Sequence, residues 1–342
     1  MKRIYFYPVI FFTMLVISSC NPAIEDIIMT VNGPIPSSEM GITLTHEHVL
    51  VDFIGADSTG YHRWNKQEVV EVVTPHLLAI QNLNVNTLIE CTPIYIGRDP
   101  ELLKRLSDRT GMHLITNTGY YGAVNNKYIP AAFYQMSAQE VSALWIEEFE
   151  NGIEGSGIRP GFIKIGVNPD DTLSPEHKKI ITAAALAHQK TGLVIASHTG
   201  PEQPAFEQIK VLEAHGVDPS AFIWVHAQKG TLEGNIRAAR SGAWISLDNV
   251  NITRPPDAKF NVKWYAERIT ALKEANLLHK VLISHDAGWY SPGEENGGSF
   301  RGFTGIFKIL VPLLKRSGFS QLDLDQLLIT NPREAFTLKI PV

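Results

Sequence analysis

The stretch Leu44-Thr45-His46-Glu47-His48-Val49 places two histidines one residue apart in a segment with the composition of a β-strand. Alternate side chains of a strand point to the same face, so we expect His46 and His48 to lie about 7 Å apart, where one metal ion can bind both imidazoles. Glu47 then points to the opposite face. Such a pair arises by chance in many chains, so its meaning depends on the residues that accompany it.

Four other metal-binding side chains each end a short apolar segment rich in valine and isoleucine. They are Lys164, His198, His226 and Asp286, in the segments 161–166, 194–198, 223–226 and 281–286. Segments of this length and composition are typical of buried parallel strands. Polar residues at the carboxyl ends of such strands are where a β/α barrel places its active site.

The intervals between these residues match the repeat of a barrel. Lys164 and His198 are 34 residues apart, and His198 and His226 are 28 apart, close to the roughly 30 residues of one strand and helix. The 60 residues from His226 to Asp286 leave room for a seventh strand at 242–248, and the candidates 87–90 and 113–117 precede Lys164. We therefore predict an α/β fold, a TIM (β/α)8 barrel, with a binuclear metal centre at the carboxyl ends of strands one, four, five, six and eight.

These residues resemble the phosphotriesterase-like branch of the amidohydrolase superfamily, which includes phosphotriesterases, lactonases and phosphotriesterase-related proteins. The similarity begins at Thr30-Val31-Asn32-Gly33-Pro34-Ile35, continues through Gly41-Ile42-Thr43-Leu44-Thr45-His46-Glu47-His48, and ends with Asn331-Pro332-Arg333-Glu334-Ala335-Phe336. The resemblance implies one metal ion on His46, His48 and Asp286 and a second on His198 and His226. It also implies that Lys164, carboxylated on its amine by carbon dioxide, bridges the two ions.

The surroundings of Lys164 favour the same chemistry. A lysine between Phe162, Ile163 and Ile165 would bury an ammonium group, which costs several kcal/mol unless the charge is paired or neutralised. A carbamate removes that cost and can bind one cation through each oxygen. The alternative is a lysine that extends from the barrel mouth or pairs with a carboxylate.

Length and charge predict one domain. The chain has 342 residues with a formal net charge of −5, which suits a single barrel over 21–342 and gives no basic face for nucleic acid. Residues 1–20 combine Met1-Lys2-Arg3, an apolar run and Ser18-Ser19-Cys20. We interpret them as a lipoprotein signal, cleaved before a lipidated Cys20, with an ordinary secretory signal as the alternative. The expected location is the bacterial cell envelope, on the periplasmic or outer-membrane side, with membrane contact through the lipid anchor only.

The metal set predicts hydrolysis of a small-molecule substrate. Two cations about 3.5 to 4 Å apart can hold a hydroxide between them as nucleophile, and Asp286 can accept its proton. Mixed imidazole, carboxylate and carbamate ligands favour Zn2+, with Mn2+ and Co2+ as alternatives. For substrate binding we select Tyr120, Tyr121, Trp289 and Arg301 in the loops after strands three and eight, although packing within the loops is an equal alternative.

Two positions depart from the family pattern and leave the substrate open. In phosphotriesterases an Asp after the last barrel histidine and a His near the end of strand seven relay the proton, and the corresponding residues here are Lys229 and Asn249. We expect a lactonase or carboxylic esterase. The alternatives are an amidase for small N-acyl compounds, a phosphotriesterase, and a non-catalytic envelope lipoprotein that binds metal or ligand. Whether the protein forms a homodimer is left open.

Overall fold

The computed structural model describes residues 1–5 and 26–338. Cys20, the expected lipidation site, lies outside these residues. In the described part of the chain, no helix has the length and apolar character needed to cross a membrane.

Eight parallel strands form the centre of the fold, when β5 with β6 and β11 with β12 are each counted as one interrupted strand. The strands pair in two series, β11-β10-β9-β8-β7-β6 and β12-β3-β4-β5. Thr116 alone separates β5 from β6, and residues 284–287 separate β11 from β12. A backbone hydrogen bond of 3.0 Å from Asp286 to the His46 carbonyl joins the eighth strand to the first. The predicted TIM barrel is confirmed, with strands β3 (Ile42–Leu50), β4 (Val85–Glu90), β5 (His113–Ile115), β6 (Asn117–Thr118), β7 (Phe162–Gly166), β8 (Ile195–His198), β9 (Phe222–Val225), β10 (Trp244–Leu247), β11 (Val281–Ile283) and β12 (Gly288–Tyr290).

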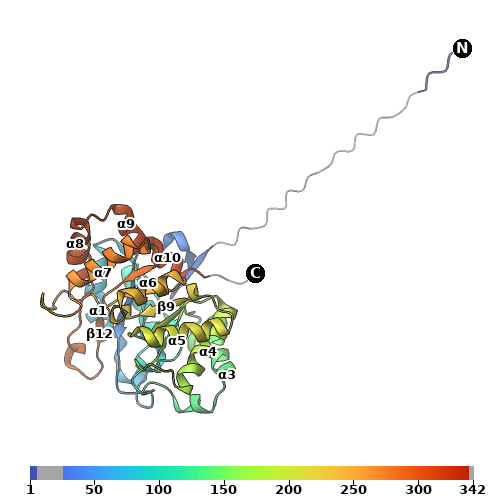
Figure 1. Ribbon diagram of the computed structural model, residues 1–342. Coiled ribbons are helices and arrows are strands. Elements are labelled where there is room, and N and C mark those ends of the chain that lie inside the picture. Colours follow the sequence, from blue (N-terminus) through green and yellow to red (C-terminus); the bar gives the residue numbers. More distant parts are fainter. Residues whose placement is uncertain (6–25, 339–342) are drawn as a thin grey trace.

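Helices surround the strands, as Figure 1 shows for α4 to α7. Many begin at a residue that caps the free backbone N–H groups: Ser137 and Glu140 form a reciprocal capping box at α3, which satisfies two of those donors. The helices are α1 (Lys66–Gln81), α2 (Pro100–Thr110), α3 (Ala138–Asn151), α4 (Pro175–Thr191), α5 (Glu202–Ala214), α6 (Leu232–Arg240), α7 (Val262–Glu274), α8 (Val311–Arg316), α9 (Gln321–Asp325) and α10 (Asn331–Phe336).

Alternate strand residues divide between two buried clusters. Ile163, Ile165 and Trp224 belong to the larger cluster, which includes the apolar faces of the helices. Phe162 and Ile223 belong to the cluster that fills the barrel interior. This alternation is the period of two expected of strands, and it places Lys164 on the same side as Phe162.

A hairpin at the start of the domain closes one end of the barrel. Strands β1 (Ile27–Thr30) and β2 (Gly33–Pro36) pair antiparallel, and Ile28 joins the interior cluster together with Phe336 of α10. The Phe336 ring packs edge-on against Phe162 at a centroid distance of 5.5 Å. Phe162 begins β7, and Lys164 follows it. The hairpin and α10 therefore lie at the amino ends of the strands, and the predicted site lies at their carboxyl ends.

Candidate metal centre

The six predicted ligands come together around one cavity. His46, His48, Lys164, His198, His226 and Asp286 all line a hollow of about 110 Å³ at the carboxyl ends of the strands. None of the six is more than 9 % exposed except His198, which is partly buried. The barrel therefore gathers side chains that are up to 240 residues apart in sequence, as a site built from several strand ends requires.

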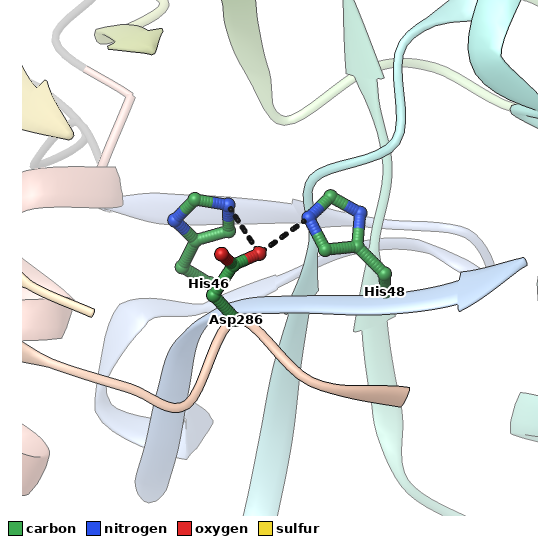
Figure 2. Close-up of side chains that lie close together, drawn as sticks. All are labelled: His46, His48 and Asp286. Carbon is green, nitrogen blue, oxygen red and sulfur yellow. Dashed lines mark ion pairs between the residues drawn. The ribbon is translucent and has the colours of Figure 1, made fainter. Parts of the chain in front are cut away.

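His46, His48 and Asp286 form the first group that could hold a metal ion. The Asp286 Oδ1 atom lies 3.2 Å from His48 Nε2 and 3.7 Å from His46 Nε2. Figure 2 shows both rings turned toward this one oxygen, with the two histidines on the same strand and Asp286 on a separate segment. Two imidazole nitrogens and one carboxylate oxygen are a donor set suited to zinc and similar ions.

His198 and His226 form a second pair beside the first. His198 Nδ1 and His226 Nε2 are 2.9 Å apart, and the His226 ring stacks on His46 at 5.3 Å between centroids. Two nitrogens at this separation can bind a single ion, which would replace their mutual contact. The pair therefore fits the second metal ion of a binuclear centre.

Lys164 lies between these groups with its charge unpaired. Its side chain is 1 % exposed, and Nζ lies 3.4 Å from His46 Nε2. Among the residues that the structure describes, no carboxylate oxygen approaches Nζ within the 4.0 Å of an ion pair. A buried ammonium beside a histidine is unfavourable, so the site fits a modified or metal-bound lysine better than a free one.

Local backbone irregularities direct three of the six predicted ligands, His46, His226 and Asp286, toward the cavity. The register of β3 against β4 shifts between Leu44 and Glu47, and a bulge of this kind turns the following residues. Consistent with this, Leu44 packs in the outer cluster whereas His46 lines the cavity. His226 and Asp286 have left-handed φ angles of 61° and 51°, which end their strands and turn the side chains toward the cavity.

Asp248 is hydrogen-bonded to one histidine from each of the two metal-binding groups. Its Oδ2 atom lies 2.9 Å from His46 Nδ1, and its Oδ1 atom lies 2.7 Å from His226 Nδ1. Ser246 Oγ donates to it at 2.8 Å. With Nδ1 bonded to a carboxylate, each ring presents Nε2 to the cavity, which is the arrangement that orients metal-binding histidines.

A separate network orients His48. His48 Nδ1 lies 2.8 Å from Thr92 Oγ1, which in turn donates to Glu90 Oε1 at 2.5 Å. The Val49 backbone N–H donates to the same oxygen at 3.2 Å. Here a hydroxyl stands between the imidazole and the carboxylate, and the ring again presents Nε2 to the cavity.

Glu47 fixes the segment that carries Asp286. As expected it points away from the cavity, and it is fully buried. Its Oε1 atom accepts from Ser284 Oγ, the His285 backbone and His285 Nδ1 at 2.6–2.9 Å, and its Oε2 atom accepts from the Ala287 backbone at 2.9 Å. His285 therefore makes hydrogen bonds behind the site: Nδ1 contacts Glu47, and Nε2 accepts from the Ile306 backbone N–H at 2.9 Å.

Asp248 and Glu90 were not among the residues selected from the sequence. Both nevertheless end predicted strands, 242–248 and 87–90, in the same way that the six candidate ligands end theirs. Applying the rule on strand ends to every strand would have found them. Thr92, in contrast, carries no sequence signal of its own.

Burial controls the ionisation of the histidines. Burial, together with the charge of Lys164, lowers the pKa of His46 to about 4. Burial and a neighbouring histidine lower the pKa of His198 well below its usual range. Both rings are therefore neutral at pH 7 and have a lone pair for a metal. For Asp286, burial opposes ionisation, but the hydrogen bond with His48 and nearby imidazole charge hold the pKa at about 2.

The remaining wall of the cavity is apolar and aromatic. Besides the six residues above, its described lining consists of Val51, Phe53, Cys91, Pro93, Ile96, Tyr121 and Trp289. The Tyr121 ring packs edge-on against His198 at 4.9 Å, and the Trp289 ring against His48 at 6.1 Å. Of the four residues selected for substrate binding, these two lie at the cavity.

The other two lie beside it. Tyr120 is 8 % exposed, and its ring packs against Tyr95 and Trp145 at 5.7 and 5.5 Å. The Arg301 guanidinium donates to the backbone carbonyl of Asp286 and lies over the Trp289 ring. Tyr120 and Arg301 are thus absent from the described lining of the cavity, and their role in substrate binding stays a prediction.

The structure also shows where the two residues that depart from the family pattern, Lys229 and Asn249, lie. Lys229 is exposed and ends a short helical turn after His226. Asn249 follows β10, and its Nδ2 atom donates to Asp286 Oδ2 at 3.2 Å. An amide that cannot take up a proton thus occupies the position next to the candidate proton acceptor.

Comparison with known proteins agrees with this geometry. Residues 27–336 match the model of the phosphotriesterase family. The chain belongs to the phosphotriesterase family. It is 30 % identical to the phosphotriesterase homology protein of Escherichia coli K12, over 86 % of this chain and 98 % of the relative. It is 26 % identical to the N-acetyltaurine hydrolase of Danio rerio, over 91 % of this chain and 98 % of the relative.

A solved structure supports the fold of this phosphotriesterase-family protein. The organophosphorus hydrolase from Deinococcus radiodurans superposes with a TM-score of 0.81 at 23 % identity, covering 91 % of this chain and 97 % of that one. Family membership makes the protein a metal-dependent hydrolase acting on a small molecule, in a family that uses a binuclear metal centre.

Proposed function

We propose that the protein hydrolyses a lactone or a related carboxylic ester. The observation that carries this proposal is the cavity beside the metal-binding groups, which measures about 110 Å³ and has an apolar and aromatic wall. Attack on a carbonyl forms a compact tetrahedral centre, whereas attack on a phosphotriester forms a five-coordinate centre with three substituents. A narrow cavity therefore favours the carbonyl substrate.

We further propose which residues hold the metal ions. His46, His48 and Asp286 hold one divalent ion, and His198 and His226 hold the other. Lys164, carboxylated on Nζ, contributes an oxygen to each. Zinc suits the mixed donor set, and Mn2+ or Co2+ can substitute. When bound, the ions supply Lewis-acid polarisation of the substrate oxygen and lower the pKa of the attacking water.

The protein groups then position the reactants and move the proton. Asp286 directs Oδ1 toward His46 and His48. Oδ2 accepts one hydrogen bond from Asn249 and keeps a second lone pair that can accept the proton that the attacking water loses. Tyr121 and Trp289 form part of the cavity wall, and their rings would limit the access of bulk water to the reactants. The fixed tautomers of His46 and His226 keep their Nε2 atoms directed at the reaction centre.

An amidase for small N-acyl compounds is the second candidate. The similarity to an N-acetyltaurine hydrolase favours it. Apart from Lys164, however, the described residues that line the cavity include no cationic side chain to bind an anionic group such as a sulfonate. If the protein is an amidase, we therefore expect uncharged N-acyl amides to be better substrates than N-acyl taurine.

A hydrolysis screen decides among these activities. Purified protein, with metal removed and with Zn2+, Mn2+ or Co2+ restored, would be assayed on aliphatic lactones, carboxylic esters, N-acyl amides and phosphotriesters. The proposal expects metal-dependent turnover that is fastest on a lactone or ester. A triester or amide with a higher kcat/KM than every lactone and ester would contradict it, and no turnover in any class would favour a binding protein.

Lys164→Ala tests the bridging lysine. We expect it to reduce the ratio of metal to protein from about two toward one or below and to abolish turnover, because each ion loses a ligand. A short carboxylate such as propionate should restore part of both. Elemental analysis and activity assays measure these outcomes, and unchanged metal content would show that Lys164 has only a structural role.

We also propose that Cys20 carries a lipid that anchors the protein to the bacterial cell envelope. The basic start, the apolar run and Ser18-Ser19-Cys20 support this. Labelled fatty acid should enter the wild-type protein in cells and be absent from Cys20→Ser. Label that persists in the variant would exclude Cys20.

A further inference from the structure

The carboxylate of Asp286 uses its two oxygens for different contacts. Oδ1 lies within 3.2 and 3.7 Å of the Nε2 atoms of His48 and His46. Oδ2 points away from them and accepts a hydrogen bond of 3.2 Å from Asn249 Nδ2. The orientation of the whole carboxylate therefore depends on which end of the Asn249 amide faces it.

An asparagine amide alone does not fix that choice. Its oxygen and nitrogen have nearly the same size, so rotation by half a turn would place an acceptor, Oδ1, against the Asp286 carboxylate. The chain supplies a group that selects one orientation: Arg254 Nη2 donates to Asn249 Oδ1. A guanidinium has donors only, so Oδ1 must face Arg254, and Nδ2 must face Asp286.

Arg254 is itself held from a second side. Its Nη1 atom donates to the Phe260 backbone carbonyl at 2.9 Å. Phe260 has a left-handed φ of 60°, and its ring packs edge-on against Trp264 of α7 at 4.9 Å. The guanidinium is therefore fixed between the loop before α7 and the end of β10, so that it can hold Asn249 in place.

We propose that Arg254 is a positioning residue that acts through Asn249 on Asp286. The guanidinium sets the orientation of the amide, and the amide holds the carboxylate with Oδ1 toward His46 and His48 and Oδ2 toward Asn249. This inference rests on the proposed metal centre but not on the identity of the substrate.

The test combines a double-mutant cycle with a metal-binding measurement. We expect Arg254→Ala to raise the dissociation constant of the Zn2+ held by His46, His48 and Asp286 about 3- to 10-fold, measured against a competing chelator, and to lower kcat about 10-fold with little change in KM. Arg254→Lys should recover part of both effects, because an ammonium can also donate to Oδ1. Asn249→Asp keeps the contact with Arg254 but removes the donor to Asp286, so it should be as harmful as Arg254→Ala.

The double variant Asn249→Leu/Arg254→Ala should be no worse than Asn249→Leu alone, because both single changes break the same chain of contacts. The proposal would be overturned if the losses caused by Asn249→Leu and Arg254→Ala multiplied in the double variant. It would also be overturned if Asn249→Asp kept wild-type zinc affinity. Lys104→Ala is the control: Lys104 also donates to an asparagine, Asn32 Oδ1, at 2.9 Å, in the turn between β1 and β2 at the other end of the barrel. It should leave zinc affinity unchanged, and an equal loss there would assign the effect to general destabilisation.

Zinc affinity also separates this proposal from the proposed function. If no lactone or ester is turned over but Arg254→Ala still weakens zinc binding, the assigned substrate is wrong and the positioning role stands. If the lactone is hydrolysed and Arg254→Ala changes neither zinc affinity nor kcat, the positioning role is wrong and the function stands.

Discussion

Asp248 and Glu90 are both fully buried carboxyl groups beside the metal-binding histidines, yet they support the site differently. Asp248 contacts two imidazoles directly, at 2.9 and 2.7 Å. Glu90 reaches a single imidazole through the hydroxyl of Thr92. Burial opposes ionisation of Asp248, but His226 and His46 hold its pKa well below the usual range. Burial raises the pKa of Glu90, because its partners compensate less.

The pKa values of Asp248 and Glu90 shift in opposite directions because the two carboxyl groups have different hydrogen-bond donors and different neighbouring charges. A buried carboxylate is stable only if nearby charge and donors replace the water it has lost. Asp248, which follows β10, contacts His46 on β3 and His226 directly after β9, and these histidines belong to different metal-binding groups. Asp248 thus links the two halves of the centre, whereas Glu90 and Thr92 support only the half that contains His48.

Asp248→Asn should have the largest effect. The amide keeps the size of the side chain, but its Nδ2 donor would face one of the two Nδ1 atoms. That ring would then carry its proton on Nε2, which faces the cavity. We expect bound metal to fall below one ion per chain and kcat/KM to fall at least about 100-fold, since each disturbed ligand costs roughly 10- to 100-fold.

Asp99→Asn is the control for this change. Asp99 is also a buried aspartate, and it accepts from Trp64 Nε1 and Lys66 Nζ at 3.0 and 2.9 Å, outside the cavity. It should lower the melting temperature while the protein keeps two ions. If Asp248→Asn retains both ions and normal activity, the proposed link between the two halves is absent.

Thr92→Val should affect one half of the centre only. The substitution removes the hydroxyl between His48 and Glu90 while keeping the side-chain volume. We expect one ion to bind about 10-fold more weakly and the other to stay as tight as in the wild type, measured by stepwise removal with a chelator.

Thr116→Val provides the comparison, because Thr116 is also buried and its hydroxyl has no hydrogen-bond partner in the described structure. Its zinc affinities should match those of the wild type. Equal weakening of both ions by Thr92→Val would mean that Glu90 supports the centre as a whole, and the contrast with Asp248 would fail.

Glu47→Gln should reduce stability more than catalysis. Glu47 accepts four hydrogen bonds from residues 284–287, and the glutamine amide would turn a donor toward one of these donors. We expect the metal-free protein to lose about 2 to 3 kcal/mol of unfolding free energy, measured by urea denaturation, and kcat/KM to fall about fivefold. Glu148→Gln, which weakens the pair with Arg98 away from the cavity, should lower stability without changing kcat/KM.

The sequence predicts the barrel and the positions of its strands because both depend on local regularities. Apolar runs about 30 residues apart repeat along the chain, and polar residues that end them must meet at one end of a parallel barrel. The same regularities brought all six candidate ligands to one cavity. Asp248 and Glu90 also end predicted strands, but they were not among the predicted site residues.

Other features depend on contacts that no periodicity encodes. Ile223 and Val225 face the barrel interior, so strict alternation would turn His226 outward, and only its left-handed backbone directs it to the cavity. Similarly, the hydrogen bond from Asn249 to Asp286 joins residues 37 apart, one after β10 and the other between β11 and β12. The placement of Tyr120 behind the wall depends on packing with Tyr95 and Trp145, which the sequence does not reveal.

Trp289 should have the smallest effect, and on selectivity rather than on metal binding. Its ring forms the wall beside His48, whereas Asp248 and Glu90, which orient the ligands, are not among the described residues that line the cavity. We expect the wild type to prefer a lactone over a phosphotriester by about tenfold in kcat/KM, equivalent to roughly 1.4 kcal/mol of transition-state binding. Trp289→Ala widens the cavity, so the larger triester should gain and the ratio should shrink about threefold, while zinc content stays at two. Trp289→Phe keeps most of the wall and should keep most of the preference. If Trp289→Ala leaves the ratio unchanged but removes zinc, the aromatic wall supports the metal ligands and does not select the substrate.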